Sequence, residues 1–211
     1  MTTPLPTPER PARSPVRAWS DPLRWLVLPW TLLVTYPMIL VSTTLFGTLA
    51  VTLSLISKHL GFHAGVYWAQ SLTWASWVRV RVEGREHLRP GQSYVILSNH
   101  QGAFDILALY GFLGRQFRWV MKQELRKVPF LGWGCAAIGH IFVDRGNSSR
   151  AIASLEAAKS QLAGGVSVLF FPEGTRSDDG RLLPFKKGGF TMARQLNLPI
   201  LPVSIAGSNR I

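Results

Sequence analysis

The feature that most limits how this chain can fold is a long stretch without charge near its amino end. No charged residue lies between Arg24 and Lys58. About 20 apolar residues are enough to cross a bilayer as a helix, and this stretch is longer than that. It also begins too deep in the chain, and runs too long, to be typical of a secretory signal peptide. The sequence therefore predicts a membrane-embedded helical segment over residues 25–63, preceded by a flexible basic arm over residues 1–24.

Two features of the uncharged stretch favour a hairpin over a single membrane span. Pro37 and Gly47 could each interrupt a helix. Basic residues also flank the stretch on both sides, and the positive-inside rule would hold both flanks in the cytoplasm. These flanking residues are Arg13, Arg17, Arg24, Lys58, Arg79 and Arg81. We therefore expect a re-entrant helical hairpin that dips into one leaflet.

The composition favours a membrane-associated protein with anionic partners. Hydrophobic residues make up 47% of the 211 residues, charged residues make up 16%, and the formal net charge is +12. Such a charge suits nucleic acid, an anionic membrane surface or a phosphorylated substrate. Six of the eight tryptophans precede residue 80, and tryptophan favours the membrane–water boundary. The segment VYWAQSLTWASWV is either a helix along that boundary or a core helix of the domain that follows.

Residues 64–211 are predicted to form one α/β domain. Short apolar or alternating runs predict strands, and longer runs with helical spacing lie among them. The predicted strands are residues 78–84, 94–99, 117–122, 140–145, 166–174 and 200–207, and the predicted helices are residues 148–165 and 188–197. This alternation implies a mixed, mostly parallel sheet flanked by helices, and ligands bind beyond the strand ends of such sheets. The single cysteine, Cys135, is interpreted as a small buried apolar residue rather than a nucleophile.

The first loop with candidate chemistry is NHQGAFD, directly after a predicted strand. His100 and Asp105 are too far apart to share one face of a continuous helix, so they can meet only if the chain turns at Gly102. A carboxylate that accepts from Nδ1–H of His100 would leave Nε2 free to take a proton from a hydroxyl group. The alternative is a helix-capping Asp105 beside an unrelated histidine. A metal site would need a second His or Cys at ligand spacing, and none is present.

Two further loops carry basic residues after predicted strands. FPEGTRS is a small polar turn with one arginine, which suits a phosphate group; it offers Glu173, Gly174, Thr175 and Arg176. Lys186 and Lys187 follow in PFKKGG, ahead of a predicted helix, and Arg145 follows another strand in FVDRGNSSR. Plainer interpretations remain open for each. The two arginines are equally consistent with surface salt bridges, and the two lysines with a solvated face.

Together these loops resemble the motifs of the glycerolipid acyltransferases, in particular the 1-acylglycerol-3-phosphate acyltransferases. NHQGAFD is similar to that family's Asn-His-x4-Asp motif, FVDRG to its second motif, FPEGTRS to its third and LPILPVSIAGS to its fourth. MKQELRKVPFLGW is similar to the segment between the first two motifs. The resemblance covers roughly residues 77–209, and four motifs in the same order are highly specific.

The resemblance implies an enzyme that transfers an acyl group from acyl-CoA or acyl-carrier protein to the sn-2 hydroxyl of lysophosphatidic acid. The product would be phosphatidic acid, for phospholipid biosynthesis. By resemblance, His100 is the general base, Asp105 orients it, and Pro202 lies on the acyl-donor side. The implied glycerol-phosphate site comprises Lys122, Arg145, Glu173, Gly174, Thr175 and Arg176. We expect no metal or other cofactor. We also expect the enzyme to contact membrane lipids, with its active site on the cytoplasmic face of the inner or plasma membrane.

Two other functions remain open from the sequence. One is acyl transfer to another lysophospholipid or to a lyso amino-acid lipid, since many head groups are anionic. The other is a non-catalytic membrane lipid-binding protein. Nucleic-acid binding is disfavoured, because the chain has no aromatic–basic module and carries a membrane segment. The sequence stops at GSNRI, directly after the fourth motif, so it is either a short member of the family or lacks carboxy-terminal elements.

Overall fold

The structure is a computed structural model that describes residues 23–144, 146, 148–158, 162, 165–177 and 181–211. The chain forms two compact units, residues 1–37 and residues 38–211. Residues 1–22, most of the expected basic arm, lie outside the described residues.

The described part of the first unit is helical. Helix α1 spans Leu23–Trp30, and the π-helical turn η1 spans Thr31–Thr35, with the N–H of Tyr36 bonded to the carbonyl of Thr31. Pro37 follows at once and has no N–H to donate to the carbonyl four residues earlier. The wider π-turn therefore lies where the ordinary helical bonding is interrupted, which is a common cause of such turns.

Helix α2 (Tyr36–Ile56) completes the long apolar stretch. Residues Leu28–Ile56 form one helical stretch of 29 residues that is long and apolar enough to cross a membrane. Large apolar side chains along it are exposed, among them Leu40, Val41 and Leu55. Exposed apolar side chains on a helix of this length favour association with a membrane.

The chain reverses at a different place from the one predicted. Pro37 lies in the first turn of α2 and Gly47 in its interior, so neither residue ends the helix, although Pro37 adjoins the π-turn. The reversal falls at Ser57, whose side chain accepts a hydrogen bond from the N–H of His59 and caps helix α3 (Lys58–Ala75). The cue in the sequence is a serine just before the first charged residue, which is a typical helix start.

Helix α3 belongs to the core of the second unit. It is buried along one side, at residues such as Phe62, Ala69 and Leu72, where it packs on the α/β domain. Trp74 and Trp77 instead point outward and are 65% and 94% exposed. Residues 66–75 of the segment VYWAQSLTWASWV thus belong to a core helix that leaves Trp74 uncovered, and Trp77 follows the end of that helix.

Five parallel strands form one sheet in the order β3-β2-β4-β1-β5. They are β1 (Val95–Ser98), β2 (Phe117–Lys122), β3 (Ile141–Val143), β4 (Ser167–Phe170) and β5 (Ile200–Val203). The predicted α/β sheet flanked by helices is confirmed. Every strand pair described is parallel, rather than mixed.

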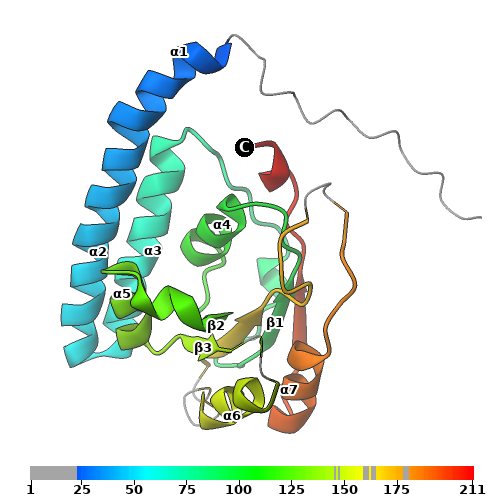
Figure 1. Cartoon of the computed structure of the whole chain (residues 1–211). Coiled ribbons are helices and arrows are strands. Elements are labelled where there is room, and N and C mark those ends of the chain that lie inside the picture. Colours follow the sequence, from blue (N-terminus) through cyan, green and yellow to red (C-terminus); the bar gives the residue numbers. More distant parts are fainter. Residues whose placement is uncertain (1–22, 145, 147, 159–161, 163–164, 178–180) are drawn as a thin grey trace, which may run out of the picture. The chain divides into compact units, whose positions relative to one another are not determined.

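Helices cover both faces of this sheet, as Figure 1 shows. Helices α3, α4 (Phe104–Phe112) and α5 (Leu131–Ile138) lie on one face, and α6 (Ser148–Ala158) and α7 (Gly188–Leu196) lie on the other. Successive strand residues alternate between the two cores: Ile96 packs toward α3 and α4, whereas Val95 and Leu97 pack toward α7. Burial on both faces explains the continuous apolar runs of the central strands. The described residues also include three short 3-10 helices: η2 (Arg85–His87), η3 (Gln123–Lys127) and η5 (Ser208–Arg210).

Residues 78–84 do not form the predicted strand. They pair with no strand in the described part of the chain. A hollow of about 310 Å³ lies between this segment and residues 201–206, next to the free edge of β5. The alternating pattern identified a segment with two different faces, but no strand edge lies within bonding reach of it.

The strand order places β1 between β4 and β5. The carboxyl ends of neighbouring parallel strands lie at the same edge of the sheet. The loop after β1 and the loop after β4 therefore meet there, and these loops carry NHQGAFD and FPEGTRS.

Candidate active site

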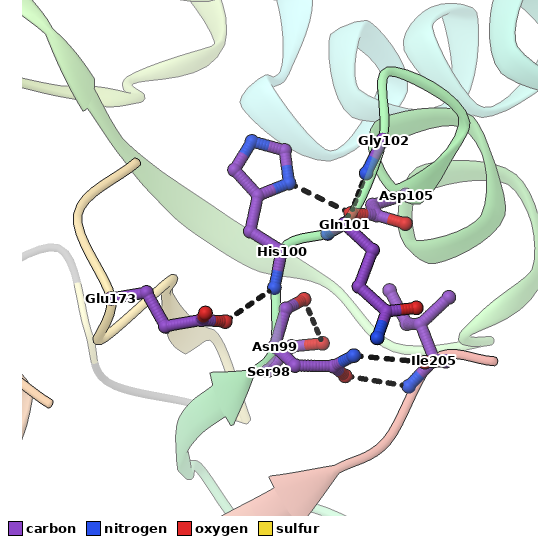
Figure 2. Close-up of polar contacts among 8 residues, drawn as sticks. All are labelled: Ser98, Asn99, His100, Gln101, Gly102, Asp105, Glu173 and Ile205. Carbon is purple, nitrogen blue, oxygen red and sulfur yellow. Dashed lines mark hydrogen bonds and ion pairs between the residues drawn. The ribbon is translucent and has the colours of Figure 1, made fainter. Parts of the chain in front are cut away.

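The loop after β1 brings His100 and Asp105 together. Nδ1 of His100 lies 2.8 Å from Oδ2 of Asp105, which is in the first turn of α4 (Figure 2). The predicted turn at Gly102 is present: its N–H donates to the same Oδ2 at 2.9 Å, as does the N–H of Gln101 at 2.6 Å. Because Oδ2 is an acceptor, Nδ1 carries the proton and Nε2 keeps its lone pair.

The Asp105 carboxylate is fully buried yet stays charged. Burial raises its pKa, but hydrogen bonds outweigh that effect and hold the pKa below its ordinary value. The bonds come from Nδ1–H of His100 and the N–H groups of Gln101 and Gly102, and the side chain of Ser208 also contributes to lowering the pKa. A fixed negative charge at this point orients the imidazole and stabilises the imidazolium that forms when Nε2 takes a proton.

The loop after β4 holds the backbone of His100 on both sides. Oε1 of Glu173 accepts from the N–H of His100 at 2.7 Å, and the N–H of Ser177 donates to the His100 carbonyl at 3.0 Å. The other carboxylate oxygen of Glu173 accepts from the N–H of Leu183 at 2.8 Å. Glu173 is buried, and both of its oxygens are engaged with backbone amides. This arrangement favours a positioning role over direct contact with a phosphate group.

Phe171 packs flat against the imidazole of His100. Its ring stacks on the imidazole of His100 with centroids 3.9 Å apart and planes 6° apart. Trp119 of β2 packs against the other side of this pair, 5.4 Å from Phe171. Phe171 is not among the residues predicted for the site. Its position between a buried strand and a proline was the available signal.

Asn99 ties the catalytic loop to the end of β5. Its side-chain amide donates to the carbonyl of Ile205 at 2.8 Å and accepts from the N–H of Ile205 at 2.7 Å (Figure 2). The residue just before His100 is thereby fixed by two hydrogen bonds to a segment far away in the sequence. Sequence reasoning missed this role, because Ile205 acts through its backbone alone.

A cavity of about 400 Å³ opens in front of His100. Four of the residues predicted for phosphate binding line it: Lys122, Gly174, Thr175 and Arg176. Gly174 has φ +74°, a conformation that favours glycine, and a Cβ there would lie 2.6 Å from Nζ of Lys186. Lys186 therefore lies beside this loop and adds a second positive charge to it.

Two predicted residues lie elsewhere. Arg145 is outside the described residues. Pro202 is on β5, opposite Leu97, and lines the separate hollow beside residues 78–84 rather than the cavity of His100. Its assignment to the acyl-donor side stays a prediction.

The rest of the cavity wall is apolar and extends toward α2. Trp68, Tyr110, Leu131 and Cys135 line both the main cavity and a smaller one of about 50 Å³, which is walled almost entirely by apolar groups of α2, α3 and α5. Burial raises the pKa of the Cys135 thiol to about 12. The thiol stays protonated at neutral pH, which agrees with its interpretation as a packing residue. No group of three or more metal-ligating side chains occurs in the described part of the chain.

In this parallel α/β sheet, a hydrogen-bonded His–Asp pair faces a cavity that has a basic side and an apolar side. The family model described as Acyltransferase matches residues 79–206. The chain belongs to this family.

Named relatives point the same way. The chain is 40% identical over 127 residues to 1-acyl-sn-glycerol-3-phosphate acyltransferase alpha of Homo sapiens, covering 60% of this chain and 45% of the relative. It is 35% identical over 144 residues to 1-acyl-sn-glycerol-3-phosphate acyltransferase LPAT1, chloroplastic, of Arabidopsis thaliana, covering 65% and 40%. The chain thus spans less than half the length of these relatives.

A solved structure shares the fold. The crystal structure of the 1-acyl-sn-glycerophosphate (LPA) acyltransferase, PlsC, from Thermotoga maritima matches with a TM-score of 0.74 and 29% identity. The match covers 88% of this chain and 76% of that one.

Proposed function

We propose that this protein transfers an acyl group from an acyl thioester to the sn-2 hydroxyl of 1-acylglycerol-3-phosphate, forming phosphatidic acid. The observation that carries the proposal is the 2.8 Å contact between Nδ1 of His100 and Oδ2 of Asp105, at the wall of a cavity that also presents Lys122 and Arg176. Membership of the Acyltransferase family and the names of the relatives support it.

His100 acts as the base. Its Nε2 takes the proton of the acceptor hydroxyl while the hydroxyl oxygen attacks the thioester carbonyl carbon. The tetrahedral intermediate collapses, the C–S bond breaks, and the departing thiolate takes the proton back from the imidazolium. Asp105 stays ionised throughout and holds the ring. The thioester is already activated, so the transfer needs no metal or redox cofactor, and the donor is acyl-CoA or acyl-carrier protein.

The phosphate group of the acceptor binds on the basic side of the cavity. Arg176 offers a two-pronged donor, Lys122 a point charge, and the turn at Gly174 and Thr175 backbone N–H groups. Arg145 lies outside the described residues, and its contribution to this site rests on its place in the second motif alone. Glu173 supports this site through the backbone of His100 rather than by touching the anion.

The apolar side of the cavity accommodates hydrocarbon. Trp68, Tyr110, Leu131 and Cys135 separate the main cavity from the smaller apolar one and offer a dry surface for an acyl chain. A substrate with one anionic end and one long apolar chain matches both halves of the site. Such substrates reside in membranes, so we place the active site at the cytoplasmic face of the inner or plasma membrane, in contact with membrane lipids. Basic residues on both flanks of the apolar stretch support this side.

The test is an assay of the full chain in detergent, with radiolabelled acyl-CoA or acyl-carrier protein and a panel of lysolipids, in the presence and absence of a chelator. We expect lysophosphatidate to be among the best acceptors and the chelator to have no effect. His100→Ala should abolish turnover while lysophosphatidate still binds, and the exposed His59, changed to Ala, serves as the matched control. Preference for another lysolipid would move the assignment to that acceptor. Lipid binding without any transfer would leave a non-catalytic lipid-binding protein.

A further inference from the structure

One oxygen of the Asp105 carboxylate lacks a partner. Oδ2 accepts three hydrogen bonds, from His100, Gln101 and Gly102. Oδ1 points away from the imidazole (Figure 2), is buried, and accepts none from the residues that the structure describes. A buried charged acceptor without a donor is strongly unfavourable, and native sites rarely leave one unpaired.

A donor without a partner lies in the same place. Oγ of Ser208, in the short helix η5, is buried and makes no hydrogen bond within the described ranges. The residue is close to the catalytic loop, since a Cβ on Gly102 would lie 2.6 Å from the Ser208 carbonyl oxygen. Its side chain also acts on Asp105, because it contributes to lowering the pKa of that carboxyl.

The segment that carries Ser208 is held against the catalytic loop. The two hydrogen bonds between Asn99 and the backbone of Ile205 fix the chain where it leaves β5. Ser208 follows three residues later. These bonds hold the segment that carries Ser208 close to the catalytic loop.

We propose that Ser208 is a positioning residue whose Oγ–H donates to Oδ1 of Asp105 and keeps Oδ2 aligned with Nδ1 of His100. The idea rests on the proposed acyl transfer, in which His100 is the base. Each carboxylate oxygen then has its own assignment: Oδ2 orients the imidazole, and Oδ1 anchors the carboxylate to the end of β5. Without the anchor, the carboxylate is free to rotate away from His100 and its negative charge is less stabilised.

The decisive comparison is Ser208→Ala, which removes the hydroxyl, against Ser208→Thr, which keeps it. In the full chain in detergent, the carboxyl of Asp105 is titrated by carbon-13 NMR, and kcat is measured. His100 is the one titratable group among those described that set the pKa of Asp105. We expect Ser208→Ala to titrate Asp105 at higher pH and to lower kcat roughly tenfold. Ser208→Thr should behave like the unchanged protein.

The titration of the Asp105 carboxyl needs no turnover. It therefore tests the role of Ser208 independently of the proposed acyl transfer. A higher titration in Ser208→Ala without any acyl transfer in the unchanged protein supports the anchor and refutes the proposed function. If Asp105 titrates at the same pH in the unchanged protein, Ser208→Ala and Ser208→Thr, the proposed hydrogen bond from Ser208 is overturned, whatever the activity. If Ser208→Ala does not fold, Ser208→Cys, of similar shape and with a weak donor, takes its place against Ser208→Thr.

The matched control is Ser167→Ala, at the opposite end of β4. Ser167 is fully buried and accepts the N–H of Tyr94 at 3.1 Å, so its loss should lower stability and leave the Asp105 titration unchanged. If Asp105 titrates at a different pH in Ser167→Ala as well, a general loss of stability is enough to change its titration. That result would overturn the specific role of Ser208.

Discussion

The ring of Phe171 lies flat against the imidazole of His100, with centroids 3.9 Å apart and planes 6° apart. The contact covers one face of the imidazole and limits rotation of the ring about the Cβ–Cγ bond of His100. Asp105 fixes the ring through Nδ1, so the ring is held both at its edge and on its face.

Replacing Phe171 by leucine keeps the apolar volume and removes the stacking. Aromatic pairs contribute about 0.5–1.5 kcal/mol beyond their buried area, so we expect kcat to fall roughly two- to tenfold with little change in KM. Steady-state kinetics measure this. Phe190→Leu is the control, since Phe190 stacks on Phe185 away from His100. Equal losses in both variants would remove the special role of Phe171.

Glu173→Gln separates a positioning role from phosphate contact. A glutamine oxygen can accept one of the two backbone N–H groups, from His100 or from Leu183, and its NH₂ group then faces the other. We expect the free energy of unfolding to fall by about 1–3 kcal/mol, together with kcat. Urea unfolding and kinetics test this. Unchanged stability with a raised KM for lysophosphatidate would instead assign Glu173 to the phosphate.

Arg176→Ala should act mainly on the acceptor. Loss of one charged contact with a phosphate costs about 2 kcal/mol, so KM for lysophosphatidate should rise tens-fold. The KM for the acyl donor should change little. Arg194→Ala, at the end of α7 and outside the lining of the cavity, is the control. A lower kcat at unchanged KM would place Arg176 at the transition state.

The buried His140 makes the stability of the fold depend on pH. The N–H of Trp119 donates to its Nδ1 at 3.0 Å, and Nε2 lies 2.8 Å from the hydroxyl of Tyr110, so the ring is held neutral. Burial, with a smaller effect of Arg118, lowers its pKa from 6.5 to about 3. Between these two values the unfolded chain binds a proton that the folded chain does not, so stability falls as pH decreases.

From pH 7 to pH 5, the loss should be about 2 kcal/mol. Urea unfolding at several pH values measures it. His140→Gln does not titrate and should show a flatter dependence over the same range, even though it is less stable at every pH. An equal slope in both proteins would assign the pH dependence to other groups.

The catalytic loop was open to sequence reasoning because its information is local. A turn at Gly102, a strand before it and an acid in the first turn of a helix together specify the meeting of His100 and Asp105. The same holds for the strands with continuous apolar runs. Because both faces of these strands are buried, their residues form continuous apolar runs that can be recognised in the sequence.

What escaped prediction depends on neighbours far away in the chain. Whether residues 78–84 pair as a strand depends on a partner strand elsewhere in the chain, which no local pattern encodes. Asn99 and Ile205 are 106 residues apart and meet through a backbone group that any residue would supply. The bend at Ser57 was missed because proline and glycine received more weight than a helix-capping serine.

The place of β1 in the sheet also sets the order in which the active site can form. Both neighbours of β1, β4 and β5, come later in the chain. While the protein is being synthesised, the strand that leads to His100 therefore has two open edges until β4 and then β5 have emerged. Pairings over such distances form slowly. The catalytic loop is thus among the first parts of the domain to be made and among the last to reach its final shape.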